Sequence, residues 1–476
     1  MASTAAQPAD SHLKRSLSHG QMTMIVLGSA LGTGLFLGSG SAITLTGPAI
    51  ILSYAIGSMI AAVIGGAAGE MAVRYPVRGG FGSIATRYLS PYAGFLTRWA
   101  YWTATCIITG LELVAVSSYL TYWWPQLPLW VGIVAFGLLI LALNIRSVKH
   151  FGATEFLLSS VKVFALVAFI LVGLCLIFFG VPGHEATGTA NLVNDGGFMP
   201  NGFDSVWLSL AIVMFSFGGI EMISISAAEA QDPARSVRTS AKAMMWRLAT
   251  FYVLSMFIVA SLVPWQTAAA LDGTIATSPF VMVFAEVGVP AAASITNFVV
   301  LVAALSAANA NLYASSRLMH SMAGDRMAPH ALAQVSSTGI PVRAMMVSLS
   351  GIVLAVILAV VLPTAAFGVM ITLVMVCALT VWVLILLAYI AFKRIEGNSS
   401  AFRLWGGRLT AGAAILALFA IWVALFRLNN NVLPATVGVV YFVLLTILYF
   451  AIIKHQLTVD EEAFSEARQA AGHTEG

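Results

Sequence analysis

The chain has 476 residues, of which 59% are hydrophobic and only 9% are charged. A soluble globular domain carries about 25% charged residues, so this composition excludes a surface that faces water throughout and predicts a protein embedded in lipid. The formal charge is +4, and the Lys and Arg residues are spread over short segments, which argues against nucleic-acid binding.

Apolar runs divide the chain into twelve predicted membrane-spanning helices, because each run is close to the roughly 20 residues that cross a bilayer as a helix. The predicted spans are 22–46, 48–73, 93–123, 128–145, 153–181, 204–230, 243–265, 279–323, 344–362, 366–392, 411–427 and 432–454. We expect the eighth to consist of a short helix followed by a long span from about Pro290. Residues 1–20 and 456–476 are polar tails around a transmembrane domain at 21–455.

Basic residues set the expected orientation of this domain. If the N-terminus lies in the cytoplasm, Arg427 is the one basic residue on the opposite side, and Lys162 is left inside a span. This asymmetry predicts a multi-pass protein of the inner (plasma) membrane with both termini in the cytoplasm. The loops leave no room for a soluble catalytic domain, and the cysteines and histidines form no metal-ligand pattern. We therefore expect neither an enzyme nor a metal or cofactor site.

Clusters of glycine interrupt the first and sixth predicted spans, at Gly28 to Gly34 and at Phe215 to Glu221. Glycine costs about 1 kcal/mol in a helix interior relative to alanine. A helix broken at membrane depth persists only where protein or a water-filled cavity satisfies its backbone. Each break lies near the start of a block of five spans, which predicts inverted repeats at about 22–181 and 204–393 with two extra helices at about 411–454.

The two breaks together predict a site for a zwitterion. At the first break, backbone N–H groups at the positive end of a half-helix can hold a carboxylate, and they belong to Gly32, Thr33 and Gly34. Carbonyl groups released at the second break can accept hydrogen bonds from an ammonium group, and they belong to Phe215, Ser216, Phe217 and Gly218. Close helix packing through small residues is the alternative for the glycines. The two phenylalanine rings either cover the substrate or pack in the core.

Ionisable residues at membrane depth are candidates for function. A lysine in apolar surroundings can release its proton, so Lys162 is a candidate for proton coupling; the alternatives are a side chain that reaches the membrane surface and a static ion pair. Glu112 either shapes the substrate pocket or hydrogen-bonds to a neighbouring helix. Glu221 follows the second break directly and can accept its free N–H groups.

Two further acids lie near the expected cytoplasmic ends of spans. Glu70 is close to Arg74 in sequence, and Glu229 is close to Arg235 and Arg238. We expect ion pairs there that close a gate or cap a helix end.

Several segments resemble the amino acid transporter family of the amino acid–polyamine–organocation superfamily. They include Leu27 to Gly38 (LGSALGTGLFLG), Phe217 to Met222 (FGGIEM), Gly69 to Pro76 (GEMAVRYP), Phe151 to Phe156 (FGATEF) and Asn309 to Arg317 (NANLYASSR). The resemblance implies a leucine-transporter-like fold with five-plus-five inverted repeats. It also implies proton-driven amino-acid uptake, with backbone atoms of the first and sixth spans binding the substrate.

The resemblance also implies roles for single residues. Lys162 occupies the position of a fifth-span lysine tied to proton coupling, and Glu112 that of a third-span acid present in many members. Ser29 departs from the usual Gly-Gly pair, and we count it among the substrate-binding residues of the first break.

We therefore expect a secondary active transporter that imports a neutral amino acid, such as proline, alanine or an aromatic one, by proton symport with alternating access. It would work as a monomer surrounded by lipid. Exchange or facilitated diffusion without proton coupling is the nearest alternative. A cationic amino acid or GABA as substrate, and an ion channel as a different class, also remain open.

Overall fold

The computed structural model describes residues 32–77, 79–146, 148–180, 185–227, 233–269, 278–286, 290–336, 339–397, 402–428 and 432–455. Within these ranges every regular element is helical. The α-helices are α2 (Ser39–Thr46), α3 (Ile50–Arg74), α4 (Gly80–Tyr88), α5 (Pro91–Leu120), α6 (Leu129–Arg146), α7 (Val148–Phe178), α8 (Gly202–Val213), α9 (Met222–Ser226), α10 (Pro233–Leu262), α11 (Trp265–Ala269), α12 (Pro279–Glu286), α13 (Pro290–Gly324), α14 (Val342–Ser348), α15 (Ser350–Val361), α16 (Ala366–Ile395), α17 (Gly407–Arg427) and α18 (Val432–Ala451).

The structure also contains shorter helical turns. They are η1 (Gly34–Gly38), a π-helical turn, and the 3-10 turns η2 (Gly47–Ala49), η3 (Ala190–Leu192), η4 (Met214–Phe217), η7 (His330–Ala333) and η8 (Ile453–His455).

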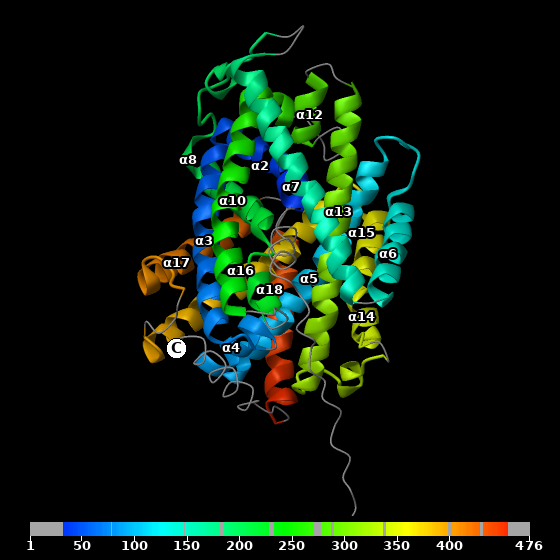
Figure 1. Ribbon diagram of the computed structural model, residues 1–476, viewed down its shortest axis with the longest axis vertical. Coiled ribbons are helices and arrows are strands. Elements are labelled where there is room, and N and C mark those ends of the chain that lie inside the picture. Colours follow the sequence, from blue (N-terminus) through cyan, green and yellow to red (C-terminus); the bar gives the residue numbers. More distant parts are fainter. Residues whose placement is uncertain are drawn as a thin grey trace, which may run out of the picture.

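The long helices run side by side in one bundle (Figure 1). Within the described ranges, ten helical runs are long and apolar enough to cross a membrane, and Leu129–Ile145 is a shorter apolar helix. Helix α5 is central, since it packs against α13, α16, α15, α6 and α4. Helices α17 and α18 lie at the edge and expose large apolar side chains such as Leu416, Phe419 and Leu433. An all-helical bundle with such an apolar exterior is a multi-pass membrane protein.

Local sequence explains where several helices begin. Proline is the first residue of α5, α10, α12 and α13, a position where its missing N–H costs nothing. Helix α5 is also capped by Ser90, whose hydroxyl oxygen accepts a hydrogen bond from the Ala93 N–H at 3.1 Å. The short helix and long span expected around Pro290 are α12 and α13.

The structure keeps one predicted boundary between spans and divides another predicted span. The boundary between the first two predicted spans coincides with Gly47, whose backbone is not helical; α2 ends at Thr46, and η2 leads into α3. This glycine has φ +60°, and a side chain there would approach Pro200. The predicted span 344–362 is divided into α14 and α15 at Leu349.

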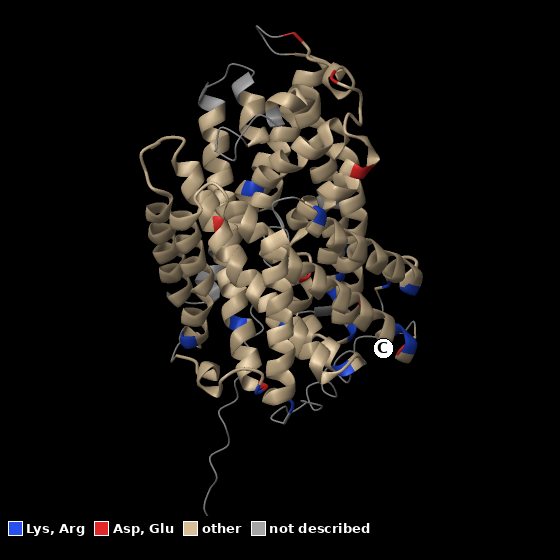
Figure 2. Cartoon of the chain, turned by 180° about the vertical axis from the view of Figure 1, so that it is seen from behind, with Lys and Arg blue, Asp and Glu red and all other residues tan. Residues whose placement is uncertain are grey.

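Helix α4 has no counterpart among the predicted spans. It lies near the lower end of the molecule in Figure 1 and packs against α5, α16, α9 and α3. It begins at Gly80 after its N-cap residue Gly79, and both glycines have positive φ. Arg98 of α5 donates a hydrogen bond to Ser83 of α4 and forms an ion pair with Asp325. This end of the bundle is therefore tied together by polar contacts, and Figure 2 shows Lys and Arg concentrated in the same half of the molecule.

Candidate functional site

Of the first predicted break, the structure describes only the residues from Gly32 onward, which are helical from Gly34 and tightly packed. Gly32 and Thr33 begin the described chain and lead into η1, whereas Ser29 lies outside the described residues. A Cβ atom on Gly32 would lie 2.7 Å from Oε1 of Glu112, and one on Gly34 would lie 2.6 Å from the Cα atom of Ser216. Glycine is therefore required for the backbones of the two breaks to touch, so the packing alternative applies to these residues in addition to any binding role.

The second break is a real interruption of the helix. Helix α8 ends at Val213, η4 follows, and α9 begins only at Met222. Gly219 has φ +95°, which other residues rarely adopt. Its N–H donates to Oε1 of Glu221 at 3.1 Å, while Oε2 of Glu221 accepts from the indole N–H of Trp382 at 3.1 Å. The acid next to the break thus holds the unwound segment and links it to α16.

Tyrosine side chains from two other helices hold Ser216 in place. The hydroxyl of Tyr54 hydrogen-bonds to Oγ of Ser216 at 2.9 Å, and the hydroxyl of Tyr252 donates to the Ser216 carbonyl at 2.7 Å. The Phe215 carbonyl accepts from the Gly218 N–H at 3.1 Å. Two carbonyls expected to bind an ammonium group therefore already accept one hydrogen bond each, and a ligand would use their second lone pairs.

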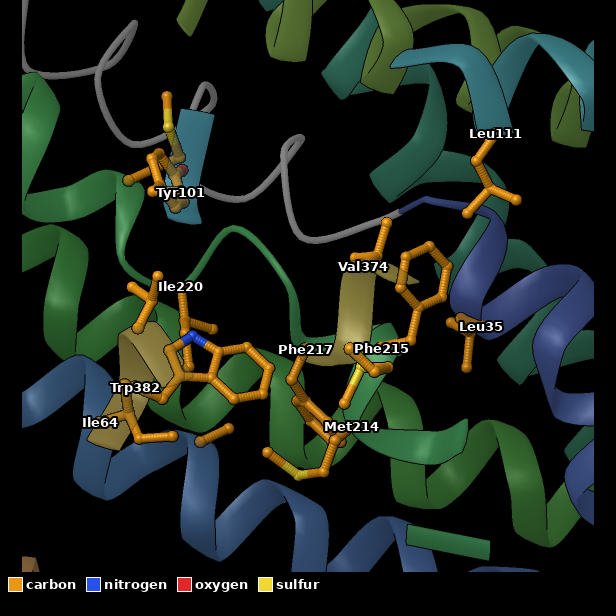
Figure 3. Close-up of a cluster of buried hydrophobic side chains, with 14 of the residues drawn as sticks. Leu35, Ile64, Tyr101, Leu111, Met214, Phe215, Phe217, Ile220, Val374 and Trp382 are labelled. Carbon is orange, nitrogen blue, oxygen red and sulfur yellow. The ribbon is translucent and has the colours of Figure 1, made fainter. Parts of the chain in front are cut away.

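The two phenylalanines of the second break lie in different surroundings. Phe215 lines the cavity described below. Phe217 is completely buried, with its ring centroid 4.8 Å from that of Tyr252 and 6.1 Å from that of Tyr54. In Figure 3 both rings belong to a cluster of buried apolar side chains that also contains Trp382. For the ring of Phe217 the structure favours core packing over a role in covering a ligand.

Both breaks line one cavity. Gly32 and Gly34 form one side of it, and Phe215, Ser216 and Gly218 form another. The same cavity is bounded by both buried acids that the sequence places near the breaks, Glu112 and Glu221. Backbone groups and carboxylates from segments far apart in the chain thus meet around one space.

Helices α5 and α13 close the rest of the cavity. Thr105 and Ile108 come from α5, and Ala310 and Asn311 come from α13. Among the described residues, no Lys or Arg side chain lines the cavity. Apolar side chains with a few polar groups are the usual lining of a small-molecule site.

Glu112 contacts the first break directly. The Thr33 N–H donates to Oε1 of Glu112 at 3.3 Å, and the carboxylate is nearly completely buried. The sequence left two alternatives for Glu112, a pocket wall or a hydrogen bond to a neighbouring helix, and the structure combines them. This contact also occupies an N–H group that the sequence assigns to a substrate carboxylate.

Lys162 of α7 is completely buried, so its side chain does not reach the surface of the protein. It interacts electrostatically with Glu155 and Glu112. Lys162 does not line the cavity. It interacts with Glu112, and Glu112 in turn accepts the hydrogen bond from the Thr33 N–H of the first break.

Glu155 is a buried acid that the sequence analysis did not single out. It lies seven residues before Lys162, which places both on one face of α7. Its Oε1 accepts hydrogen bonds from the hydroxyls of Ser306 on α13, at 2.6 Å, and Ser159, at 3.3 Å. In the sequence, this acid could have been recognised by its position two helical turns before the intramembrane lysine.

Glu70 forms an ion pair with Lys393 of α16, at 2.9 Å between Oε1 and Nζ. Its Oε2 also accepts from the Tyr389 hydroxyl at 2.7 Å and from the Leu404 N–H at 2.8 Å. The expected ion pair is therefore formed between two helices. Its basic partner is Lys393, which the closeness of Glu70 to Arg74 in sequence did not predict. Glu229 lies outside the described residues.

These features define a multi-pass helical membrane protein with a cavity lined by two glycine-rich segments, Gly32–Gly34 and Phe215–Gly219. The chain belongs to the amino acid permease family, whose sequence pattern, described as "Amino acid permease", matches residues 21–459. Members of this family carry amino acids across membranes, so the protein is a transporter and not an enzyme.

Individual relatives agree with this family. The chain is 40% identical over 413 residues to "Aromatic amino acid transport protein AroP" of Escherichia coli K12, covering 87% of this chain and 88% of the relative. It is 40% identical over 391 residues to the protein of that name in Salmonella typhimurium SL1344, covering 82% and 84%. It is 38% identical over 389 residues to "Uncharacterized amino acid permease YtnA" of Bacillus subtilis 168, covering 82% and 83%.

Proposed function

We propose that this permease imports an aromatic amino acid together with a proton, by alternating access to the cavity between the two breaks. The observation that carries the proposal is the meeting of both broken segments at one cavity lined by Glu112 and Glu221. Backbone N–H groups of the first break would bind the α-carboxylate, and carbonyl groups of the second would bind the α-ammonium group.

Two observations support an aromatic side chain among neutral amino acids. Relatives that share 40% identity are named as aromatic amino acid transport proteins. The cavity wall also includes Ile108, Phe215 and Met222, which offer the apolar, aromatic and thioether contacts that suit a ring. Because the described lining contains no Lys or Arg, it provides no partner for an acidic side chain.

The architecture proposed with this function is a twelve-helix, five-plus-five inverted repeat. The breaks at η1 and η4 lie in contact, as expected of corresponding positions in two repeats. Helices α17 and α18 would be the two extra helices, and they expose large apolar side chains at the edge of the bundle. The concentration of Lys and Arg in one half of the molecule (Figure 2) supports placing that half at the cytoplasmic side of the inner membrane, where both termini would also lie.

Proton coupling is proposed to act through Lys162. When the amine is charged, it attracts Glu112 and Glu155; when it loses its proton, that attraction ends. Glu112 accepts a hydrogen bond from the Thr33 N–H of the first break, so it competes with the substrate carboxylate for this N–H group. A change in the charge of Lys162 would therefore alter how strongly Glu112 competes. The monomer contains all of these groups.

Uptake of radiolabelled phenylalanine, tyrosine and tryptophan into proteoliposomes, with an imposed pH gradient and a panel of competing amino acids, tests the proposal. We expect accumulation that collapses with a protonophore. Lys162→Ala should lose gradient-driven accumulation while retaining substrate binding, and Lys242→Ala, at an exposed position of α10, should not. Uptake that persists without the gradient would instead indicate exchange or facilitated diffusion, and currents without saturable uptake would indicate a channel.

A further inference from the structure

The amide of Asn311 is oriented by its own helix. Its Nδ2 donates to the Ala307 carbonyl at 2.8 Å. Because a carbonyl oxygen can only accept, this bond determines which end of the amide is nitrogen. Oδ1 of Asn311 accepts no hydrogen bond within the part of the chain that the structure describes, and the residue lines the cavity. The cavity therefore has a side-chain acceptor that the protein leaves unused.

The cavity that Asn311 lines also contains apolar side chains. Ala310 precedes it on α13, and Ile108 and Met222 line the same cavity. Thr105, the other uncharged polar side chain contributed by α5 and α13, donates its proton to the Trp102 carbonyl at 2.9 Å. The cavity thus combines apolar surface with an amide oxygen that can accept one directed hydrogen bond.

We propose that Asn311 is a specificity-determining residue that favours aromatic substrates whose ring carries a hydrogen-bond donor. Its Oδ1 would accept the phenol O–H of tyrosine or the indole N–H of tryptophan, whereas phenylalanine would leave it unpaired. A site that hydrogen-bonds a polar group of its substrate rejects an analogue that lacks the group more strongly than it discriminates by size. This inference rests on the proposed transport of aromatic amino acids.

Competition experiments with radiolabelled phenylalanine in proteoliposomes test the inference. In the unaltered protein, unlabelled tyrosine and tryptophan should compete about tenfold more strongly than phenylalanine. Asn311→Leu keeps a side chain of similar size without an acceptor, so it should reduce both preferences about tenfold and leave competition by phenylalanine nearly unchanged. Ile108→Val, a size change without a change in hydrogen bonding, should shift all three competitors together.

The outcomes separate this inference from the proposed function. If the unaltered protein takes up none of the three amino acids, aromatic transport fails. If it takes up phenylalanine but shows no preference for tyrosine and tryptophan, or if Asn311→Leu keeps the preference, the role of Asn311 is wrong while transport stands. Should Asn311→Leu fail to insert in the membrane, Asn311→Ala also removes the acceptor, and the same ratios decide.

Discussion

The two glycine-rich segments that meet at the cavity satisfy their backbones in different ways. At the first, the Thr33 N–H donates to Glu112, which lies 79 residues away on α5. At the second, the Gly219 N–H donates to Glu221, only two residues away in the same segment. One break depends on a side chain of another helix, whereas the other carries its own acid.

This difference assigns separate tasks to two acids that look alike in sequence. An acid shared between helices can exchange its partner when the helices move or when a substrate carboxylate competes for the same N–H group. An acid bonded within its own segment, and further tied to Trp382 of α16, holds the shape of that segment and anchors it to α16. We therefore expect Glu112 to control transport and Glu221 to control stability.

The largest effect is expected from separating the two breaks. A Cβ atom on Gly34 would lie 2.6 Å from the Cα atom of Ser216, a backbone atom that cannot rotate away. Gly34→Ala should therefore reduce substrate uptake to below about one tenth, because overpacking forces backbone shifts. The matched control is Gly38→Ala, where the nearest atom would be 4.0 Å away and uptake should be close to normal. Equal uptake by both variants would show that the two backbones need not touch.

A smaller loss of transport should follow the removal of charge at the first break. In Glu112→Gln the amide oxygen can still accept from the Thr33 N–H, so we expect a change in unfolding free energy below about 1 kcal/mol. Uptake should nevertheless fall about tenfold, since the amide no longer interacts with Lys162 as a charge. Uptake assays and thermal unfolding in detergent measure the two quantities. Loss of stability with unchanged uptake per folded molecule would reverse the roles assigned to the acids.

The second break should show the opposite pattern. Both oxygens of Glu221 accept hydrogen bonds, one from the Gly219 N–H and one from the Trp382 indole N–H. Glu221→Gln can serve only one of these donors, so we expect a loss of about 1–3 kcal/mol in stability. Combining it with Trp382→Phe should cost less than the sum of the single changes. Additive losses would mean that the two groups do not interact.

The smallest effect is expected at a bond that only braces the second break. Tyr252→Phe removes the hydroxyl that donates to the Ser216 carbonyl at 2.7 Å. We expect a stability loss of about 0.5–1.5 kcal/mol, visible as a lower unfolding temperature, with transport retained. Loss of transport without loss of stability would show that this carbonyl has to be held in place for substrate binding.

Some features of the site were predictable because they depend on local backbone chemistry. Clustered glycines and an adjacent acid point to an interrupted helix, and η4 with the turn at Gly219 is such an interruption. Other features depend on neighbours from distant segments. Two of them are contacts between segments far apart in the chain, namely the hydrogen bond between Thr33 and Glu112 and the ion pair of Glu70 with Lys393. A third is the burial of Phe217, which other helices cover. Helix α4 was missed because a nine-residue helix carries too weak an apolar signal to be recognised as a span.

The sequence by itself determined that this is a helical membrane protein with two glycine-rich segments and a few buried ionisable residues. Burial of apolar runs in lipid and the backbone cost of glycine act locally, so they can be recognised from residue types alone. Only the tertiary structure decided which partner each buried group has. It brought Glu112 to the first break, left Glu221 with its own segment, and placed the Asn311 amide on the cavity wall, because such pairings depend on how helices pack in three dimensions.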